Sequence, residues 1–371
     1  MKIGILTFQR ALNYGAVLQA YSLCSYLESS GYEAEIIDYN CVAVSEKYEY
    51  TPLSRVGALK PYIARTGQAI LHKGNRAKFN RFLLNNVPMS SLYTRGTIGS
   101  SSELYDAIVV GSDQVWNPSV TDVDTTYLLD FVSNKTKRIA YAPSLGTSDN
   151  FKKFGDDRIK NLKLFDAISC REEEGSKVLR DLGLPCENVV DPVFLINKEK
   201  WIDVSKQSIV REKAPYIFIY SVRASSTMFA YAKWLSTVTG YPVISTNIML
   251  QGDMLAAKNG FRIRSSISPA DFLHYLSNAE CVVTDSFHGV SLSIILQKRF
   301  IVEADQRKQG NTNSRLDTLL NMCGLHNRYL KDPRDEIYKD KIDYSLVQER
   351  ILPNINRSKQ YLLGALATEA M

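Results

Sequence analysis

The sequence predicts an α/β protein with parallel sheets, on three observations. Short apolar segments typical of buried strands alternate with longer segments of helical spacing along the whole chain. The alternation starts afresh after a charged stretch between residues 198 and 213. The length of 371 residues exceeds what one hydrophobic core usually holds. We therefore expect an N-terminal domain over residues 1–198 and a C-terminal domain over residues 199–371.

The N-terminal half predicts strands joined by helices. Gly31 ends a helix over residues 16–29, and Gly183 ends a later one, because glycine adopts the left-handed backbone of helix C-termini at little cost. Phe79, Phe82 and Leu83 have helical spacing and predict a further helix. The expected strands are 2–8, 34–39, 106–113, 138–146, 166–172 and 187–196.

The C-terminal half repeats this plan. A helix over 228–239 ends at Gly240, and a helix over 269–279 has Pro269 in its first turn, where no backbone N–H is needed. The tail, residues 345–367, has helical spacing as well. The expected strands are 215–223, 241–246, 280–289 and 299–304.

Composition excludes several classes of protein. A hydrophobic fraction of 45% with a net charge of +6 is incompatible with a disordered chain. No apolar run approaches the roughly 20 residues of a membrane helix, and the first apolar segment breaks at Gln9-Arg10, unlike a secretory signal. Six cysteines without a C-x-x-C pair predict buried, reduced thiols in a cytoplasmic protein and no metal site.

Residues 50–102 form a basic segment without any Asp or Glu. Its lysines and arginines are interleaved with apolar residues, which suits an anionic membrane surface or a polyanionic partner. A solvated helical insertion with counter-charges elsewhere in the fold is the plainer interpretation. Nucleic acid is not expected, because the chain is only modestly basic and carries no recognition motif.

Polar residues follow the predicted strands repeatedly. In parallel sheets ligands bind beyond the carboxyl ends of the strands, so these clusters favour a ligand cleft between two domains. Ordinary helix capping is the alternative for each cluster taken alone. The clusters are Asn13-Tyr14-Gly15, Ser112-Asp113-Gln114, Ser144-Leu145-Gly146, Arg171-Glu172, Ser221-Val222-Arg223 and Asp285-Ser286-Phe287-His288-Gly289.

His288 is the most informative single residue. It stands between the strand-like segment CVVT and the apolar helix VSLSIIL, and so at a helix N-terminus, where backbone N–H groups favour an anion. An imidazole there can contact a phosphate or act as a general acid, or it can simply cap the helix. Dinucleotide, P-loop, hydrolase and zinc-protease motifs are all absent.

Five segments together resemble the polysaccharide pyruvyl transferase family, over roughly residues 2 to 325. They are NYGAVLQAYSL (13–23), VVGSDQVWNP (109–118), RIAYAPSLG (138–146), SCREEEG (169–175) with VVDPVF (189–194), and TDSFHGVSLSIIL (284–296). The resemblance implies a GT-B-like fold, with two Rossmann-like domains facing a central cleft. It also implies transfer of the enolpyruvyl group of phosphoenolpyruvate to two sugar hydroxyls as a ketal, without metal or cofactor. The acceptor would be a bacterial capsular or exopolysaccharide, or its lipid-linked precursor.

The resemblance also suggests roles for individual residues. Phosphoenolpyruvate carries a phosphate and a carboxylate, so its site needs cations and N–H donors. His288 is expected as the acid or phosphate contact, Asp113 as the base, and Arg171, which matches the arginine of the family's S-x-R-[DE] turn, as the anion clamp. The other expected phosphoenolpyruvate contacts are Ser221, Arg223, Ser286, Gly289 and Arg315. The expected acceptor contacts are Asn13, Tyr14, Gly15, Gln114 and Trp116.

One departure from the family concerns the donor site. Some members carry Arg-Leu-His where this chain has Ser286-Phe287-His288, so Arg223 or Arg315 would have to replace the missing arginine. Were the acceptor linked to a polyprenyl diphosphate, residues 50–102 would rest on the inner face of the cytoplasmic membrane.

Two other functions stay open at this point. One is a glycosyltransferase that uses a nucleotide sugar, with Glu303 or Asp305 on the ribose. The other is a catalytically idle family member that binds polysaccharide.

Overall fold

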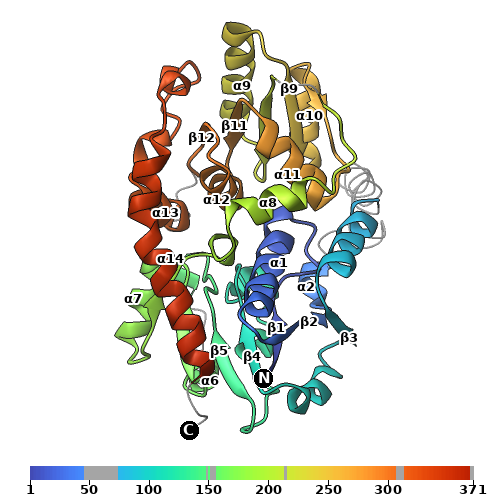
Figure 1. Ribbon diagram of the computed structural model, residues 1–371, viewed down its shortest axis with the longest axis vertical. Coiled ribbons are helices and arrows are strands. Elements are labelled where there is room, and N and C mark those ends of the chain that lie inside the picture. Colours follow the sequence, from blue (N-terminus) through green and yellow to red (C-terminus); the bar gives the residue numbers. More distant parts are fainter. Residues whose placement is uncertain (46–73, 148, 151–155, 213–214, 306–312, 368–371) are drawn as a thin grey trace, which may run out of the picture.

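Two parallel β-sheets with helices on their faces form the protein (Figure 1). This computed structural model describes residues 1–45, 74–147, 149–150, 156–212, 215–305 and 313–367. The first sheet has the strand order β3-β2-β1-β4-β5-β6-β7, and the second has the order β10-β9-β8-β11-β12. Each sheet therefore has one point where the strand order reverses, between β1 and β4 in the first and between β8 and β11 in the second.

The first sheet confirms most strands expected in the N-terminal half. Its strands are β1 (Lys2–Leu6), β2 (Glu33–Tyr39), β3 (Met89–Tyr93), β4 (Ala107–Val110), β5 (Lys137–Ala140), β6 (Ala167–Cys170) and β7 (Glu187–Asn188). The α-helices around it are α1 (Tyr14–Ser29), α2 (Val42–Ser45), α5 (Pro118–Thr121), α6 (Asp156–Leu162) and α7 (Glu173–Asp181), together with a helix over 74–86. Short 3₁₀ turns are η2 (Ile98–Leu104), η3 (Thr125–Leu128) and η5 (Pro192–Phe194).

The second sheet likewise confirms the strands expected after residue 215. Its strands are β8 (Ile217–Ser221), β9 (Val243–Asn247), β10 (Arg262–Ile263), β11 (Cys281–Thr284) and β12 (Phe300–Val302). The helices of this half are α8 (Lys198–Ser205), α9 (Ser226–Thr239), α10 (Leu250–Lys258), α11 (Pro269–Asn278), α12 (Phe287–Ile295), α13 (Ser314–Cys323) and α14 (Tyr344–Ala367), with η6 (His326–Arg328) and η7 (Glu336–Lys339).

Several segments differ from the expectation. A helical insertion was expected over residues 50–102, but their part over Met89–Tyr93 is β3, the edge strand of the first sheet, and β10 was not expected either. The strand expected over 187–196 is only β7, because Asp191, three residues after its end, and Pro192 turn the chain into η5. The charged stretch that begins at residue 198 starts with a helix, α8, which buries Trp201 completely. The indole of Trp201 donates a hydrogen bond to the carbonyl of Val193 at 3.0 Å, so this stretch belongs to the core as well as to the surface.

The last helix crosses from the second sheet back to the first. Figure 1 shows α14 running down one side of the molecule, so that its last turns lie near the first sheet. The hydroxyl of Ser358 accepts the backbone N–H of Val190 at 3.0 Å, and Tyr361 donates to the carbonyl of Ala140 at 3.2 Å. Although α14 follows the second sheet in sequence, it therefore also holds the first.

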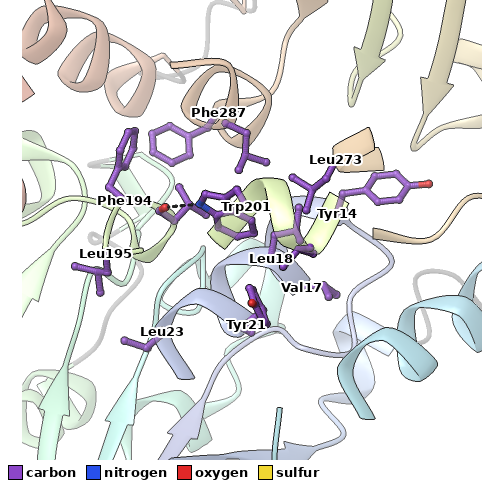
Figure 2. Packing of buried hydrophobic residues seen from close by; sticks show 14 of the residues in the cluster. Tyr14, Val17, Leu18, Tyr21, Leu23, Phe194, Leu195, Trp201, Leu273 and Phe287 are labelled. Carbon is purple, nitrogen blue, oxygen red and sulfur yellow. Dashed lines mark hydrogen bonds between the residues drawn. The ribbon is translucent and has the colours of Figure 1, made fainter. Parts of the chain in front are cut away.

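Aromatic side chains join the two halves. Figure 2 shows Tyr14, Trp201, Leu273 and Phe287 converging from four different helices. The ring of Tyr14 stacks on that of Phe272 with centroids 4.6 Å apart, across the boundary between α1 and α11. One hydrophobic cluster thus includes residues of both sheets, which fixes the placement of one domain against the other.

The basic segment contributes to the same boundary. Residues 50–73 lie outside the described residues, while Phe79, Phe82 and Leu83 are buried on the helix over 74–86, as their spacing predicts. From this helix, the Lys78 ammonium donates to a carbonyl at residue 266 of the second domain at 2.6 Å. Among the described helices, none combines the length and apolarity needed to cross a membrane.

Candidate functional site

A polar cavity of about 420 Å³ lies between the two sheets, where the strand order of each one reverses. The segments after β1, β4, β8 and β11 all contribute to it, which is the position where open parallel sheets bind ligands. The cavity brings together the predicted site residues Asn13, Asp113, Gln114, Arg223, Ser286, His288 and Arg315. A groove of about 480 Å³ between α8, α12 and α14 is larger, but its lining is mostly apolar and contains none of these residues.

His288 lies in the first turn of α12, as the sequence predicts. The hydroxyl of Ser286 caps this helix by accepting the backbone N–H of Gly289 at 3.3 Å. The imidazole is packed against Gly15 of α1 so closely that a Cβ atom at residue 15 would lie 2.1 Å from Nδ1. Its side chain keeps only 7% exposure, yet it lines the cavity. The ring is therefore held in a fixed place at the cavity wall.

Arg171 lies behind the cavity wall and not in it. Its Nη1 donates to Oδ2 of Asp191 at 2.6 Å, and its Nη2 lies 3.6 Å from Oδ1 of Asp113. The ring of Phe287 covers the guanidinium at 4.5 Å from the ring centroid. Burial alone would lower the pKa of Arg171, but the charge of Asp191 raises it above the usual value. Burial alone would raise the pKa of Asp191, but His288 and, to a lesser extent, Arg171 lower it. In this structure Arg171 is thus an internal counter-charge, unlike the direct anion clamp expected.

Asp113 extends into the cavity from the turn after β4. Its φ of +67° is a left-handed conformation that aspartate tolerates better than most residues. The carboxylate accepts the backbone N–H of Gln114 at 2.8 Å and stays partly accessible to the cavity. Next to it, the amide of Asn117 donates to Gln114 at 2.7 Å, so carboxylate and amides form one polar wall.

Two further arginines line the cavity. Arg223 lies 3.7 Å from Asp285 and 3.8 Å from Asp305, so its charge is largely compensated. Arg315 makes no ion pair within the described part of the chain, and its buried Nε has no hydrogen-bond partner there. Burial, with the charge of Arg171 added, lowers the pKa of Arg315 to about 10, well above neutral pH. Arg315 is therefore a charged guanidinium that no described carboxylate pairs with directly, which suits an anionic ligand.

Other predicted site residues lie outside the cavity lining. Trp116 is buried in the first domain, where its indole donates to the carbonyl of Tyr127 at 2.9 Å, so the structure does not place it for stacking on a sugar. Tyr14 is equally buried, in the aromatic boundary between the domains. Ser221 donates to Asp285 and accepts a backbone N–H from the next turn, and so supports that turn. Gly289 packs against Thr284 inside α12.

Asp191 belongs to the site although the sequence does not single it out. This residue lies in the segment VVDPVF, one of those that resemble the polysaccharide pyruvyl transferase family. Its side chain is fully buried and meets Arg171, Ser112 and His288. The signal was a lone aspartate after an apolar strand, followed by proline, which is also what a simple helix cap looks like.

The described residues hold no group of three or more His, Cys, Asp or Glu side chains arranged for a metal ion. All six cysteines are free and buried, as their scattered spacing predicts. Burial raises the pKa of Cys186 and of Cys323 to about 12, so these thiols stay protonated at neutral pH. The charged and titratable side chains that line the cavity are imidazole, carboxylate and guanidinium groups.

Comparisons with known proteins agree with this two-domain arrangement. Two similar solved structures are the UDP-N-acetylglucosamine 2-epimerase from Rickettsia bellii (TM-score 0.54, 10% identity, 100% of this chain and 96% of that chain) and the UDP-GlcNAc 2-epimerase from Neisseria meningitidis bound to UDP-GlcNAc (TM-score 0.51, 9% identity, 98% and 100%). At such low identity these matches establish the fold alone, which is GT-B-like, as expected. No curated protein matches the chain. A family model described as polysaccharide pyruvyl transferase matches residues 13–305, and the chain belongs to that family.

Proposed function

We propose that this transferase moves the enolpyruvyl group of phosphoenolpyruvate onto two hydroxyls of one sugar and releases phosphate. The observation that carries this proposal is the cavity itself, which is lined by His288, Arg315 and Asp113 together, with no ion pair to Arg315 from any described residue. A doubly charged anion needs the first two groups, and a sugar hydroxyl that attacks needs the third. The N-terminus of α12 adds a favourable electrostatic field for the phosphate.

The proposed reaction has two additions. A proton from His288 goes to C3 of the enol, which leaves cationic character at C2. One sugar hydroxyl attacks C2 while Asp113 accepts its proton, and the C2–O bond to phosphate then breaks. The second hydroxyl adds to C2 and closes the cyclic ketal while His288 takes up its proton, and the proton on Asp113 leaves with the phosphate. One phosphoenolpyruvate and one diol thus give one ketal and one phosphate, and both side chains return to their starting states.

Each residue of the cavity takes a role in this proposal. Arg315 binds the phosphate or carboxylate of the donor directly and supplies the charge that family members with Arg-Leu-His take from their arginine. Arg223 and Ser286 line the donor side next to it. Asn13 and Gln114 line the side of the first domain and bind acceptor hydroxyls. Arg171 acts from behind the wall by fixing the charges of Asp191 and Asp113.

The proposed acceptor is a sugar of a bacterial surface polysaccharide or of its polyprenyl-diphosphate-linked precursor, and the proposed place of action is the cytoplasm. For the lipid-linked case, residues 50–102 would contact the inner face of the membrane, supported by their lack of acidic residues. Co-sedimentation with anionic liposomes over a range of salt concentrations tests this contact. Absence of binding at low salt would remove it.

Incubation with phosphoenolpyruvate and candidate galactosides and mannosides tests the reaction. We expect phosphate release together with a sugar product that carries a pyruvate ketal by mass spectrometry. His288→Ala should abolish both signals, whereas His274→Ala, on α11 outside the cavity lining, should keep them. Phosphate release that does not depend on a sugar, or full activity of His288→Ala, would contradict the proposal.

No specific observation favours a nucleotide-sugar transferase. Glu303, expected on a ribose in that case, accepts a hydrogen bond from Ser225 at 2.7 Å and does not line the cavity. Asp305 does line it but lies 3.8 Å from Arg223. Thermal stabilisation by phosphoenolpyruvate and none by UDP is the expected result of a comparative screen.

A further inference from the structure

The imidazole of His288 is held by the N-terminal domain, although α12 packs with the second sheet. Gly15 in α1 packs directly against the imidazole, since only a residue without Cβ leaves space for the ring. Asp191, just after β7, contacts the edge of the ring, with Oδ2 at 3.4 Å from Nε2 of His288. A carboxylate of one domain and an imidazole of the other thus meet at the cavity.

Asp191 is fixed on every side. Its Oδ1 accepts the backbone N–H of Val193 at 3.1 Å. Its Oδ2 accepts from Nη1 of Arg171 at 2.6 Å and from the hydroxyl of Ser112 at 3.1 Å. The side chain has no exposure and is absent from the cavity lining, so it does not touch a substrate. Any effect of Asp191 on the reaction must pass through its neighbours.

Among the described residues, Asp191 is the one carboxylate within ion-pair distance of His288. The buried Nε2 of His288 has no closer hydrogen-bond partner in the described structure. The ring of Phe287 lies edge-on to the imidazole and also covers the guanidinium of Arg171. Phe287 therefore keeps water away from that guanidinium. Arg171 lies on the far side of the same oxygen and prevents the carboxylate from turning away.

We propose that Asp191 is a positioning residue that orients the His288 ring through Nε2. The arrangement resembles the way a buried aspartate orients the catalytic histidine of a hydrolase triad, with the two partners here drawn from two domains. The proposal rests on the proposed function only in giving His288 the role of the acid.

The test is a double-mutant cycle with Asp191→Asn and His288→Gln. Asn keeps the shape of the side chain but removes its charge. We expect Asp191→Asn to lower kcat by about 100-fold, the scale of one acid–base group, with KM for phosphoenolpyruvate little changed. In the His288→Gln background the same substitution should cause no further loss, because the residue acts through the ring. Asp130→Asn, which removes an arginine-paired carboxylate outside the cavity lining, is the matched control and should keep kcat.

A second readout does not depend on turnover. In protein labelled with ¹⁵N-histidine, the ring signals that disappear in His288→Gln should shift in Asp191→Asn and stay in place in Asp130→Asn. This measurement stands even if the native chain transfers no pyruvyl group, so failure of the proposed function and failure of the Asp191 role are distinguished. For an Asp191→Asn chain that does not fold, Ser112→Ala replaces it. The loss of one bond to the same oxygen should lower kcat several-fold with the same dependence on His288.

Three outcomes would overturn the proposal. The first is a native kcat in a folded Asp191→Asn chain. The second is an equal loss in the His288→Gln background, which would mean that Asp191 acts on the structure as a whole. The third is an unmoved set of His288 ring signals.

Discussion

Replacing Gly15 with alanine should inactivate the enzyme without unfolding it. The new Cβ would lie 2.1 Å from Nδ1 and 2.3 Å from Cγ of His288, where ordinary contacts begin at 3.4 Å. The imidazole must therefore move by about 1.3 Å. A misplacement of about 1 Å at a reacting group costs about 100-fold in rate, or about 2.7 kcal/mol in activation free energy. We expect kcat for phosphate release to fall by that factor.

The effect on stability should be much smaller. Alanine is the better residue inside a helix by about 1 kcal/mol, which offsets part of the crowding cost of about 1–3 kcal/mol. Gly364, in α14, is the matched control because nothing lies within 4 Å of a Cβ built there. Gly364→Ala should raise the free energy of unfolding by about 0.5–1 kcal/mol and leave kcat unchanged.

The assay is phosphate release at saturating phosphoenolpyruvate, with urea unfolding followed on the same preparations. A folded Gly15→Ala chain with kcat within twofold of native would refute the reasoning, because it would show that the close packing of His288 against α1 does not set its catalytic position. Equal losses in both alanine variants would refute it as well, since the control carries no contact with the ring.

Three more predictions concern Arg315, Asp191 and the six cysteines. Arg315→Gln should raise KM for phosphoenolpyruvate by about 10- to 100-fold, the value of one charge-assisted hydrogen bond, as steady-state kinetics can measure; an unchanged KM would exclude Arg315 from the donor site. The pKa of Asp191 is lowered in the folded chain, so its stabilisation is present above the unfolded value near ~3.9 and is lost as pH falls below it. Urea midpoints should accordingly fall more steeply below pH 4 in the native chain than in Asp191→Asn, and parallel curves would contradict this. Ellman's reagent should find almost no reactive thiol in the native chain and all six in denaturant, because the cysteines are buried and free; rapid reaction of the native chain would contradict their burial.

Most of the fold is predictable because its signals are local. Each apolar run such as AIVV after Asp106 is buried on both faces of a parallel sheet, which leaves a continuous hydrophobic segment instead of an alternating one. Gly240 ends α9 in a left-handed conformation, and Ser268 with Asp271 caps α11 in both directions. Such features depend on a few neighbouring residues, so the sequence shows them directly.

The features that the sequence does not show depend on contacts between distant segments. The charge of Lys198 and its neighbours predicts the domain boundary, but it does not show that Trp201 is buried there against Val193. Trp116 follows a strand in a segment that the family shares, and only the tertiary structure shows its indole bonded to Tyr127 in the core. Arg171 was expected at the ligand because nothing in the sequence indicates that Asp191, 20 residues later, compensates its charge.

The assembly of the site explains why the boundary between the domains is so extensively packed. His288 comes from the second domain, while Gly15 and Asp191, which hold its ring, come from the first. A shift of one domain by an ångström would therefore separate the imidazole from its carboxylate and disturb the proposed acid. The stacked ring of Tyr14, the helix over 74–86 and the return of α14 onto the first sheet all resist such a shift. In this chain, the contacts that hold the two domains together also position the imidazole of His288 against Asp191.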